Sequence, residues 1–269
     1  MPKFAIIISE QDPAAMNIKL KLLQLFKFSN VSIFRNRPVY QLDDTSLYSI
    51  DSLHITTDNL DKEIDADYFI FPSKHKAKSE NKTFCVHAIG NFGKAEAGGE
   101  ENKLVPAMPS HMKSALNKLK ELNDINFEVS MEATHHGPYL EKPTMFIEIG
   151  STENEWKNNS AAEIVARVIM STIEDGWEHD AAIVIGGTHY NHEANRLMSD
   201  SGYAAGHICP KHALEFLDEF MLAQMLHKSG AKLAVLDWKG LGQYKDKITK
   251  MCETLKIEVK KSKEITDSS

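Results

Sequence analysis

Residues 183–193 read Ile183-Val184-Ile185-Gly186-Gly187-Thr188-His189-Tyr190-Asn191-His192-Glu193. The β-branched apolar run predicts a buried strand, and the Gly pair after it predicts where that strand ends. A helix starting near Asn191 would bring His189, His192 and Glu193 close to one face, because residues three and four apart are helical neighbours. Imidazole and carboxylate groups at that spacing favour a zinc-like cation, whereas the simpler interpretation is a capped helix with solvated histidines.

The same alternation of β-branched runs and helical segments extends along the whole chain. Lys3–Ser9 predicts a first strand, and Asp12–Phe26 predicts a helix with Asp12 as its N-cap. Further strands are expected at 31–35, 53–57, 67–71, 83–87, 127–134, 144–149, 181–185 and 232–236. Further helices are expected at 109–122, 160–174 and 211–229, and after Gly242. Strands alternating with helices predict an α/β protein with a mostly parallel, mixed central sheet and helices on both faces.

Length and composition indicate one globular domain over residues 1–269, because no linker, repeat or charge block marks a boundary. The hydrophobic content of 42% is ordinary for a folded protein, and no apolar run approaches the roughly 20 residues of a membrane helix. We therefore expect no membrane partner. The N-terminus lacks the features of a signal peptide. Three widely separated cysteines predict reduced thiols and a cytoplasmic location: Cys85, Cys209 and Cys252.

The chain contains 12 histidines, and several follow directly on a predicted strand. Ligands of open α/β sheets bind at the carboxyl ends of strands, so these histidines are expected to line one cavity. They are His75, His87, His135, His136 and His189. His207 is expected in a loop. The remaining ones that have no such placement are His54, His179, His212 and His227.

Glu132-Ala133-Thr134-His135-His136-Gly137-Pro138 forms a second cluster. Neighbouring residues of a strand point to opposite sides, but Gly137-Pro138 indicates that the strand has ended. One of the two histidines is then expected to bind metal or act as a base, with Glu132 orienting it; the alternative is a polar strand edge. Glu148 lies inside an apolar run, where a carboxylate is costly unless it is paired or liganded.

Two weaker signals lie between these clusters. His87 ends a predicted strand and leads into a turn containing Gly90 and Asn91, whose backbone amides suit a phosphate or an oxyanion. The Gly-rich loop 88–107 is either a lid or an insertion. His111 lies in the first turn of a predicted helix, where the helix dipole keeps imidazole neutral. The sequence has no P-loop, Gly-x-Ser-x-Gly or dinucleotide-binding motif.

The net charge of −7 disfavours broad coating of nucleic acid, and no DNA partner is expected. Two lysine-rich stretches nevertheless favour a local basic rim, although either one also fits a solubilising surface. The first contains Lys74, Lys76, Lys78 and Lys82, around His75. The second contains Lys245, Lys247, Lys250, Lys256, Lys260, Lys261 and Lys263.

Six motifs occur in an order that resembles the archaeal and plant type of D-aminoacyl-tRNA deacylase. They are Ser9–Ile18, Ser73-Lys74-His75, His87–Asn91, Pro109–Met112, Glu132–Pro138 and Gly186–Tyr190. The resemblance implies a phosphorylase/hydrolase-like fold, zinc as cofactor, and D-aminoacyl-tRNA as partner. It also implies hydrolysis of the ester that joins a D-amino acid to the tRNA 3′ end. Gly186-Gly187-Thr188-His189 is also similar to the Gly-Gly-Thr-His-x-x-Glu start of the aspartoacylase and zinc-carboxypeptidase group.

These patterns predict a set of site residues, with alternatives left open. The expected metal ligands are His189 with His192 or Glu193, plus His135 or His136. The expected base or orienting group is Glu132 or Glu148, and His136 is a further catalytic candidate. The expected substrate-binding residues are His75, His87, Asn91, His111 and Lys74, of which His87 and His111 fit a second metal site equally well. A monomer is expected. The alternative functions are a zinc-dependent amidohydrolase of small acyl-amino acids or peptides, and a non-catalytic tRNA-binding module.

Overall fold

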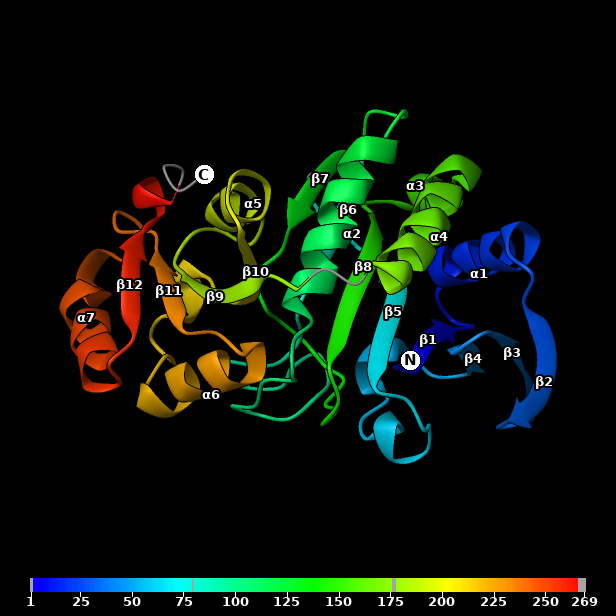
Figure 1. The fold of residues 1–269 in the computed structure, drawn as a ribbon, viewed down its shortest axis with the longest axis horizontal. Helices are drawn as coiled ribbons and strands as arrows, with labels where there is room; N and C mark the ends of the chain where they lie inside the picture. Colours follow the sequence, from blue (N-terminus) through cyan, green and yellow to red (C-terminus); the bar gives the residue numbers. More distant parts are fainter. Residues whose placement is uncertain (1, 79, 176–177, 266–269) are drawn as a thin grey trace.

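The computed structural model describes residues 2–78, 80–175 and 178–265, and its strands form two sheets (Figure 1). The larger sheet has the order β2-β3-β4-β1-β5-β8-β6-β7. Its strands are β1 Phe4–Ser9, β2 Ser29–Phe34, β3 Arg37–Leu42, β4 Thr45–Ile50, β5 Tyr68–Lys74, β6 Thr83–His87, β7 Glu128–Met131 and β8 Thr144–Gly150. Most neighbouring strands of the two sheets pair in parallel, so the predicted mixed α/β class is confirmed.

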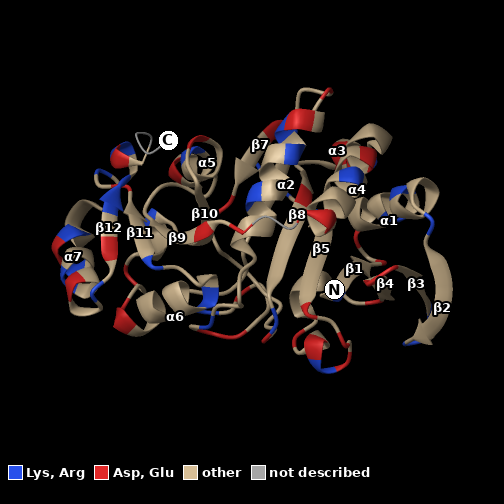
Figure 2. Ribbon diagram, in the orientation of Figure 1, with Lys and Arg blue, Asp and Glu red and all other residues tan. Residues whose placement is uncertain are grey.

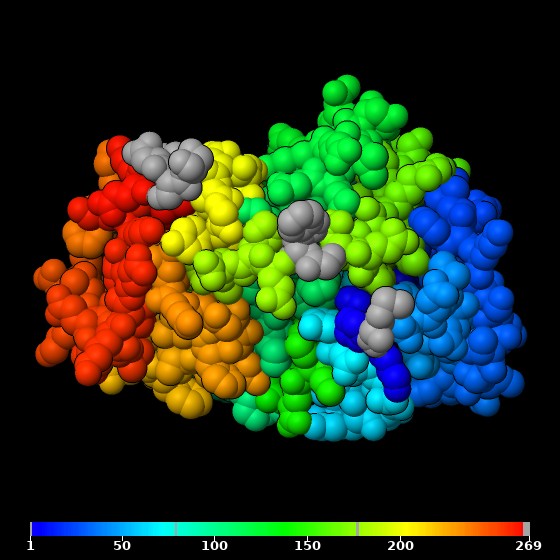
Figure 3. All heavy atoms as spheres, in the orientation of Figure 1, coloured from blue at the N-terminus to red at the C-terminus, as the bar shows by residue number. Residues whose placement is uncertain are grey.

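The second sheet is smaller and wholly parallel, with the order β10-β9-β11-β12. Its strands are β9 Asp180–Ile185, β10 Tyr203–Cys209, β11 Leu233–Leu236 and β12 Glu258–Lys261. It forms one end of the molecule, and β2 forms the other (Figures 1 and 3). Buried side chains of both sheets, such as Ile147 and Val184, belong to one hydrophobic core. The single domain over residues 1–269 stays a prediction.

Several helices begin where the sequence supplies a side-chain cap. Asp12 Oδ1 accepts the backbone N–H groups of Ala14 and Ala15 at 2.9 Å each, which confirms the predicted N-cap of the first helix. The helices are α1 Pro13–Leu25, α2 Pro109–Leu122, α3 Glu153–Trp156, α4 Asn159–Glu174, α5 His192–Asp200, α6 Glu219–Ser229 and α7 Lys245–Thr254. Among the described residues, none of these is long and apolar enough to cross a membrane. The cytoplasmic location and the monomeric state stay predictions.

Three predicted elements were wrong. The expected strand at 53–57 is a 3-10 turn, His54–Thr56, in which the buried His54 ring accepts the Ser9 N–H at 2.8 Å. The expected helix at 211–229 is divided, because Asp218 caps a new helix by accepting the Met221 N–H at 2.8 Å. His207 lies inside β10 and not in a loop.

Candidate active site

The candidate site lies on one face of the larger sheet. Glu148 of β8 is opposite Ser73 of β5 and Cys85 of β6, and His87 is opposite Phe146. Paired residues on neighbouring strands share a face of the sheet, and so do residues two apart on one strand, such as Glu148 and Phe146. Ser73, Glu148 and His87 therefore point to the same side. Because β6 runs antiparallel to β8, its carboxyl end does not meet that of β5. The site is therefore built on a sheet face and differs from the carboxyl-edge arrangement that was predicted.

Both adjacent histidines of the Glu132–Pro138 cluster reach this face. β7 ends at Met131, and His136 has a φ of 47°, in the left-handed region that non-glycine residues rarely adopt. This turn breaks the alternation of an extended chain. The His135 ring centroid lies 4.3 Å from that of His136 and 4.4 Å from that of His87. The strand ends at Met131, three residues before the predicted end at Thr134, and the turn that follows brings two rings to the site instead of one.

The three rings are oriented by backbone carbonyl groups. Nδ1 lies 3.1 Å from Ala88 O in His87, 2.8 Å from Ala133 O in His135 and 2.6 Å from Gly137 O in His136. A carbonyl oxygen only accepts, so each Nδ1 carries the proton and each Nε2 keeps its lone pair. A ligand nitrogen of each ring lies within 4.8 Å of the other two. Histidines that bind metals are held in this way.

Glu132 lies beside these rings with no exposed surface. Its two carboxylate oxygens lack a well-oriented hydrogen bond among the described residues, and so does His87 Nε2. Oε1 lies 3.2 Å from His75 Nδ1, and Oε2 lies 3.7 Å from His189 Nε2 and 3.9 Å from His87 Nε2. Burial and the nearby Glu148 charge raise the pKa of Glu132. A buried carboxylate without partners is costly, so this position is suited to a cation or a transferred proton.

Glu148, in contrast, is fully engaged. Its Oε1 accepts a hydrogen bond from Ser73 Oγ at 2.6 Å, and its Oε2 lies 3.4 Å from His75 Nδ1. Burial favours the protonated acid, but the neighbouring His75 and His87 rings outweigh it and hold the pKa of Glu148 well below its usual range. His75 Nε2 lies 2.8 Å from Tyr190 OH, and in the protonated ring it donates to that oxygen. These contacts make Glu148 and His75 a fixed ion pair behind the three rings.

The site opens into a cavity of about 420 Å³. His135, His136, His189 and Glu148 line its floor, and the side chain of His189 is 38% exposed. Burial and the neighbouring histidines lower the pKa of His189 to about 4, so its ring is neutral at pH 7. Other residues of the wall are Asp12, Leu53, His54, Ile55, Ser73, Lys74, His75 and Lys76. The cavity therefore combines an apolar wall, a basic flank and the histidine cluster.

His192 and Glu193 belong to no group of converging ligand atoms among the described residues. Helix α5 begins at His192, so His189 lies before the helix and does not share a helical face with them. The expected His189 to His192 or Glu193 pairing therefore lacks its geometric basis. Glu132 and His87 instead belong to the groups of converging ligand atoms.

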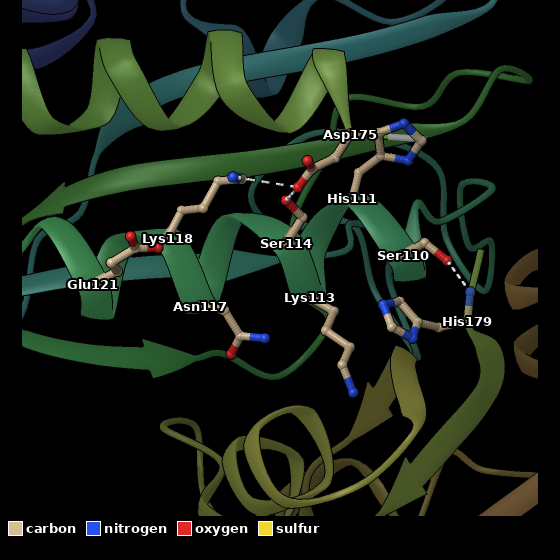
Figure 4. Close-up of a pocket in the computed structure, with 9 residues that line it drawn as sticks. All are labelled: Ser110, His111, Lys113, Ser114, Asn117, Lys118, Glu121, Asp175 and His179. Atoms are coloured by element: carbon tan, nitrogen blue, oxygen red, sulfur yellow. Dashed lines mark hydrogen bonds and ion pairs between the residues drawn. The ribbon is translucent and has the colours of Figure 1, made fainter. Parts of the chain in front are cut away.

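Two predicted substrate contacts also lie elsewhere. Asn91 Nδ2 donates to Gly98 O at 2.9 Å and to Glu100 O at 3.2 Å, which fixes the 88–107 loop. His111 packs against the rings of Phe4 and Tyr68 and lines a separate pocket of about 220 Å³ on α2 (Figure 4). His54, for which the sequence predicts no position at a strand end, lines the cavity. The apolar residues around His54 predict a strand, so its sequence context contains no signal of a functional site.

Comparisons with known proteins agree along nearly the whole chain. A family model described as D-aminoacyl-tRNA deacylase matches residues 62–260. The chain is 38% identical over 245 residues to the D-aminoacyl-tRNA deacylase of Pyrococcus furiosus, covering 87% of this chain and 90% of that protein. It is 34% identical to the Methanosarcina barkeri enzyme of the same name, covering 99% and 92%. A crystal structure of a conserved protein of unknown function shares 32% identity and a TM-score of 0.94, covering 99% and 98%.

Proposed function

The chain belongs to the D-aminoacyl-tRNA deacylase family, and we propose that the cluster on the larger sheet is its active centre. In this proposal His87, His135 and His136 hold a zinc ion through their Nε2 atoms. The supporting observations are that a backbone carbonyl holds the Nδ1 of each ring, which leaves each Nε2 as the available ligand atom, and that a ligand nitrogen of each ring lies within 4.8 Å of the other two. Three histidines and an open position are a known set for catalytic zinc.

The donor set fits a divalent cation in charge as well as in geometry. Imidazoles that bind a metal do so in the neutral form, and the Glu132 carboxylate beside them balances part of a double positive charge. When bound there, zinc would act as a Lewis acid that polarises an ester carbonyl and acidifies water. His189, which lines the same cavity, is then free to contact the substrate. His192 and Glu193 have no part in this set.

The protein's own groups then move the proton and orient the substrate. Glu132 takes a proton from the attacking water, whose oxygen bonds to the ester carbonyl carbon. When the bond from that carbon to the ribose oxygen breaks, Glu132 returns the proton to the ribose oxygen. Glu148, fixed by Ser73 and His75, keeps its charge and holds the His75 and His87 rings in place. The products are a free D-amino acid and a tRNA with a free 3′ hydroxyl.

The cavity wall supports selection of the substrate. Leu53 and Ile55 form an apolar wall, and Lys74 and Lys76 lie on its basic flank. We assign the wall to the amino-acid side chain or the terminal base, and the lysines to the terminal phosphate. An L side chain would project in a different direction from the same fixed ester, and a site that accommodates only the D direction excludes it. The amidohydrolase alternative gains no support from the relatives.

The test is metal content together with hydrolysis. Purified protein is expected to hold zinc near one equivalent, and chelation is expected to abolish release of the D-amino acid from D-aminoacyl-tRNA. His136→Ala is expected to lose both the zinc and the activity. His227→Asn, which changes an exposed histidine of α6, is the matched control and is expected to keep both. Full activity of a metal-free sample would refute the metal assignment, and an active H136A variant would refute the ligand set.

A further inference from the structure

The carboxyl edge of the smaller sheet continues directly from the proposed active site. All of its strands are parallel, so β9, β10, β11 and β12 end at the same edge. Backbone hydrogen bonds join these ends, from Lys211 N to Gly187 O at 2.9 Å and from Asp237 N to Ile185 O at 3.0 Å. The chain that leaves β9 reaches the site two residues after Gly187, at His189. The end of β9 therefore leads into the substrate cavity, which His189 lines, and the other three strands end beside it along the same edge.

This edge carries lysines arranged around one tryptophan. Trp238, which follows β11, is 37% exposed. The Nζ atoms of Lys245 and Lys261 lie 5.2 and 4.9 Å from its ring centroid. Lys211 and Lys239 follow β10 and β11 and are exposed at the same edge. We call these residues, namely Lys211, Trp238, Lys239, Lys245 and Lys261, the carboxyl-edge patch.

The lysines of the carboxyl-edge patch are available for an external anion. Within the described ranges, none of the four lies at ion-pair distance from a carboxylate, whereas Lys62, Lys103 and Lys157 elsewhere are all paired. Nearby acids are partly engaged: Asp237 accepts the Gly240 N–H, and Glu264 accepts the Lys261 N–H. Contact with the indole ring limits the freedom of two ammonium groups, so less entropy is lost when they bind. Figure 2 shows basic segments on β12 and α7, with acidic segments beside them on the same elements.

We propose that the carboxyl-edge patch binds the phosphate backbone of the tRNA acceptor stem and thereby delivers the 3′ end to His189. The proposal rests on the proposed function, because it takes tRNA as the substrate. Neighbouring strands lie about 5 Å apart, so the ends of β9 and β12 are separated by about 10 Å, the span of a few backbone phosphates. Lysine contacts to phosphate carry no base sequence information. Such contacts suit an enzyme whose substrates share a backbone and a 3′ end.

The charge-reversal test uses both edges of the same two strands. Lys239→Glu/Lys261→Glu changes the carboxyl edge. Lys232→Glu/Lys256→Glu changes exposed lysines that precede β11 and β12, at the amino edge, and is the matched control with the same change in net charge. Binding of uncharged tRNA is measured by fluorescence anisotropy from about 50 to 200 mM salt. We expect the carboxyl-edge variant to weaken binding at least tenfold and to reduce the salt slope by about 0.7 to 0.9 per lysine.

A second variant separates the role of the ring from that of charge. Trp238→Leu keeps every lysine but releases Lys245 and Lys261, and we expect tRNA binding to weaken a few-fold. For all three variants, cleavage of a small D-aminoacyl ester should stay within about twofold of wild type. Equal loss of tRNA binding in the amino-edge control, or an unchanged salt slope in the carboxyl-edge variant, would overturn the proposal. If a double variant fails to fold, Lys239→Glu alone against Lys232→Glu gives the same comparison.

The two proposals fail in different ways. If wild-type protein binds tRNA through the carboxyl-edge patch but hydrolyses neither D-aminoacyl-tRNA nor the small ester, the catalytic proposal is refuted and the binding surface stands. If it hydrolyses both substrates while the carboxyl-edge variant binds tRNA like wild type, the binding surface is refuted and the catalytic proposal stands.

Discussion

Glu132→Gln separates the proposed role of this carboxylate from a purely structural one. The amide keeps the size of the side chain but removes the negative charge that lies 3.2 Å from His75 Nδ1 and 3.7 Å from His189 Nε2. In metal-free protein this change has two opposite effects. It removes the cost of burying an unpartnered carboxylate, and it removes an attraction to nearby imidazoles. We therefore expect the melting temperature of metal-free protein to change by no more than about 3 °C.

The zinc-loaded protein should respond differently. Loss of a carboxylate next to a metal site weakens metal affinity by about 10- to 100-fold, or about 1.4 to 2.7 kcal/mol. Stabilisation by a bound ligand falls by the same amount when zinc is in fixed excess, which is about 3–10 °C for a domain of this size. Removal of a general base should also lower kcat about 100-fold or more at saturating zinc. Glu132 thus links metal affinity to turnover.

The assay is thermal unfolding with and without chelator, together with single-turnover hydrolysis of D-aminoacyl-tRNA. Glu128→Gln is the matched control, because Glu128 lies on the same strand, β7, but is exposed. It should leave the zinc-dependent shift and the rate unchanged. A Glu132→Gln protein with wild-type zinc affinity and wild-type kcat would refute the reasoning. A large loss of stability in the metal-free variant would show that Glu132 is a structural ion-pair partner.

Three further outcomes are expected. Ser73→Ala removes the 2.6 Å hydrogen bond to Glu148 and should cost about 1–3 kcal/mol of unfolding free energy, measured by urea denaturation, with a lower kcat. Burial lowers the pKa of His207 to about 3, so below about pH 6.5 the unfolded chain binds a proton that the folded chain does not. The unfolding free energy should therefore fall as the pH drops from about 6.5 towards 3, by up to about 1.4 kcal/mol per pH unit, and a His207→Gln variant should lose that part of the slope. Asn91→Ala removes two contacts to the 88–107 loop, so limited proteolysis should cut this loop faster, while unchanged cleavage would show that other contacts hold it.

The sequence predicted elements whose own residues carry a strong pattern. The helix Pro109–Leu122 and the strand Thr83–His87 match their predicted bounds, because apolar spacing and β-branched content are local properties. β10 was missed, since Ala204, Ala205 and Gly206 have low strand propensity and are placed by pairing with β9. Tertiary contacts, and not local propensity, determine the strand conformation of these residues.

The candidate site, too, could be predicted only where local residues determine the structure. The two-residue sequence His135-His136 could be recognised as a cluster, and the end of its strand followed from Gly137-Pro138. The antiparallel direction of β6 could not be predicted from local residues, because it is set by pairing with β8, a strand much later in the chain. That direction is what places His87 beside Glu148 and Glu132. The spacing of His189 and His192 instead suggested a shared helix that begins too late.

The hydrogen bond between Tyr190 and His75 joins residues that are 115 positions apart in the chain, one after the smaller sheet's β9 and one after the larger sheet's β5. Closing so long a loop is slow compared with forming a helix or a hairpin. The contact between Tyr190 and His75, and the position of His189 in the cavity, therefore form only after both sheets have docked. During synthesis, these contacts would be missing until β9 has left the ribosome. Recovery of full activity after denaturation would lag behind recovery of helical circular dichroism.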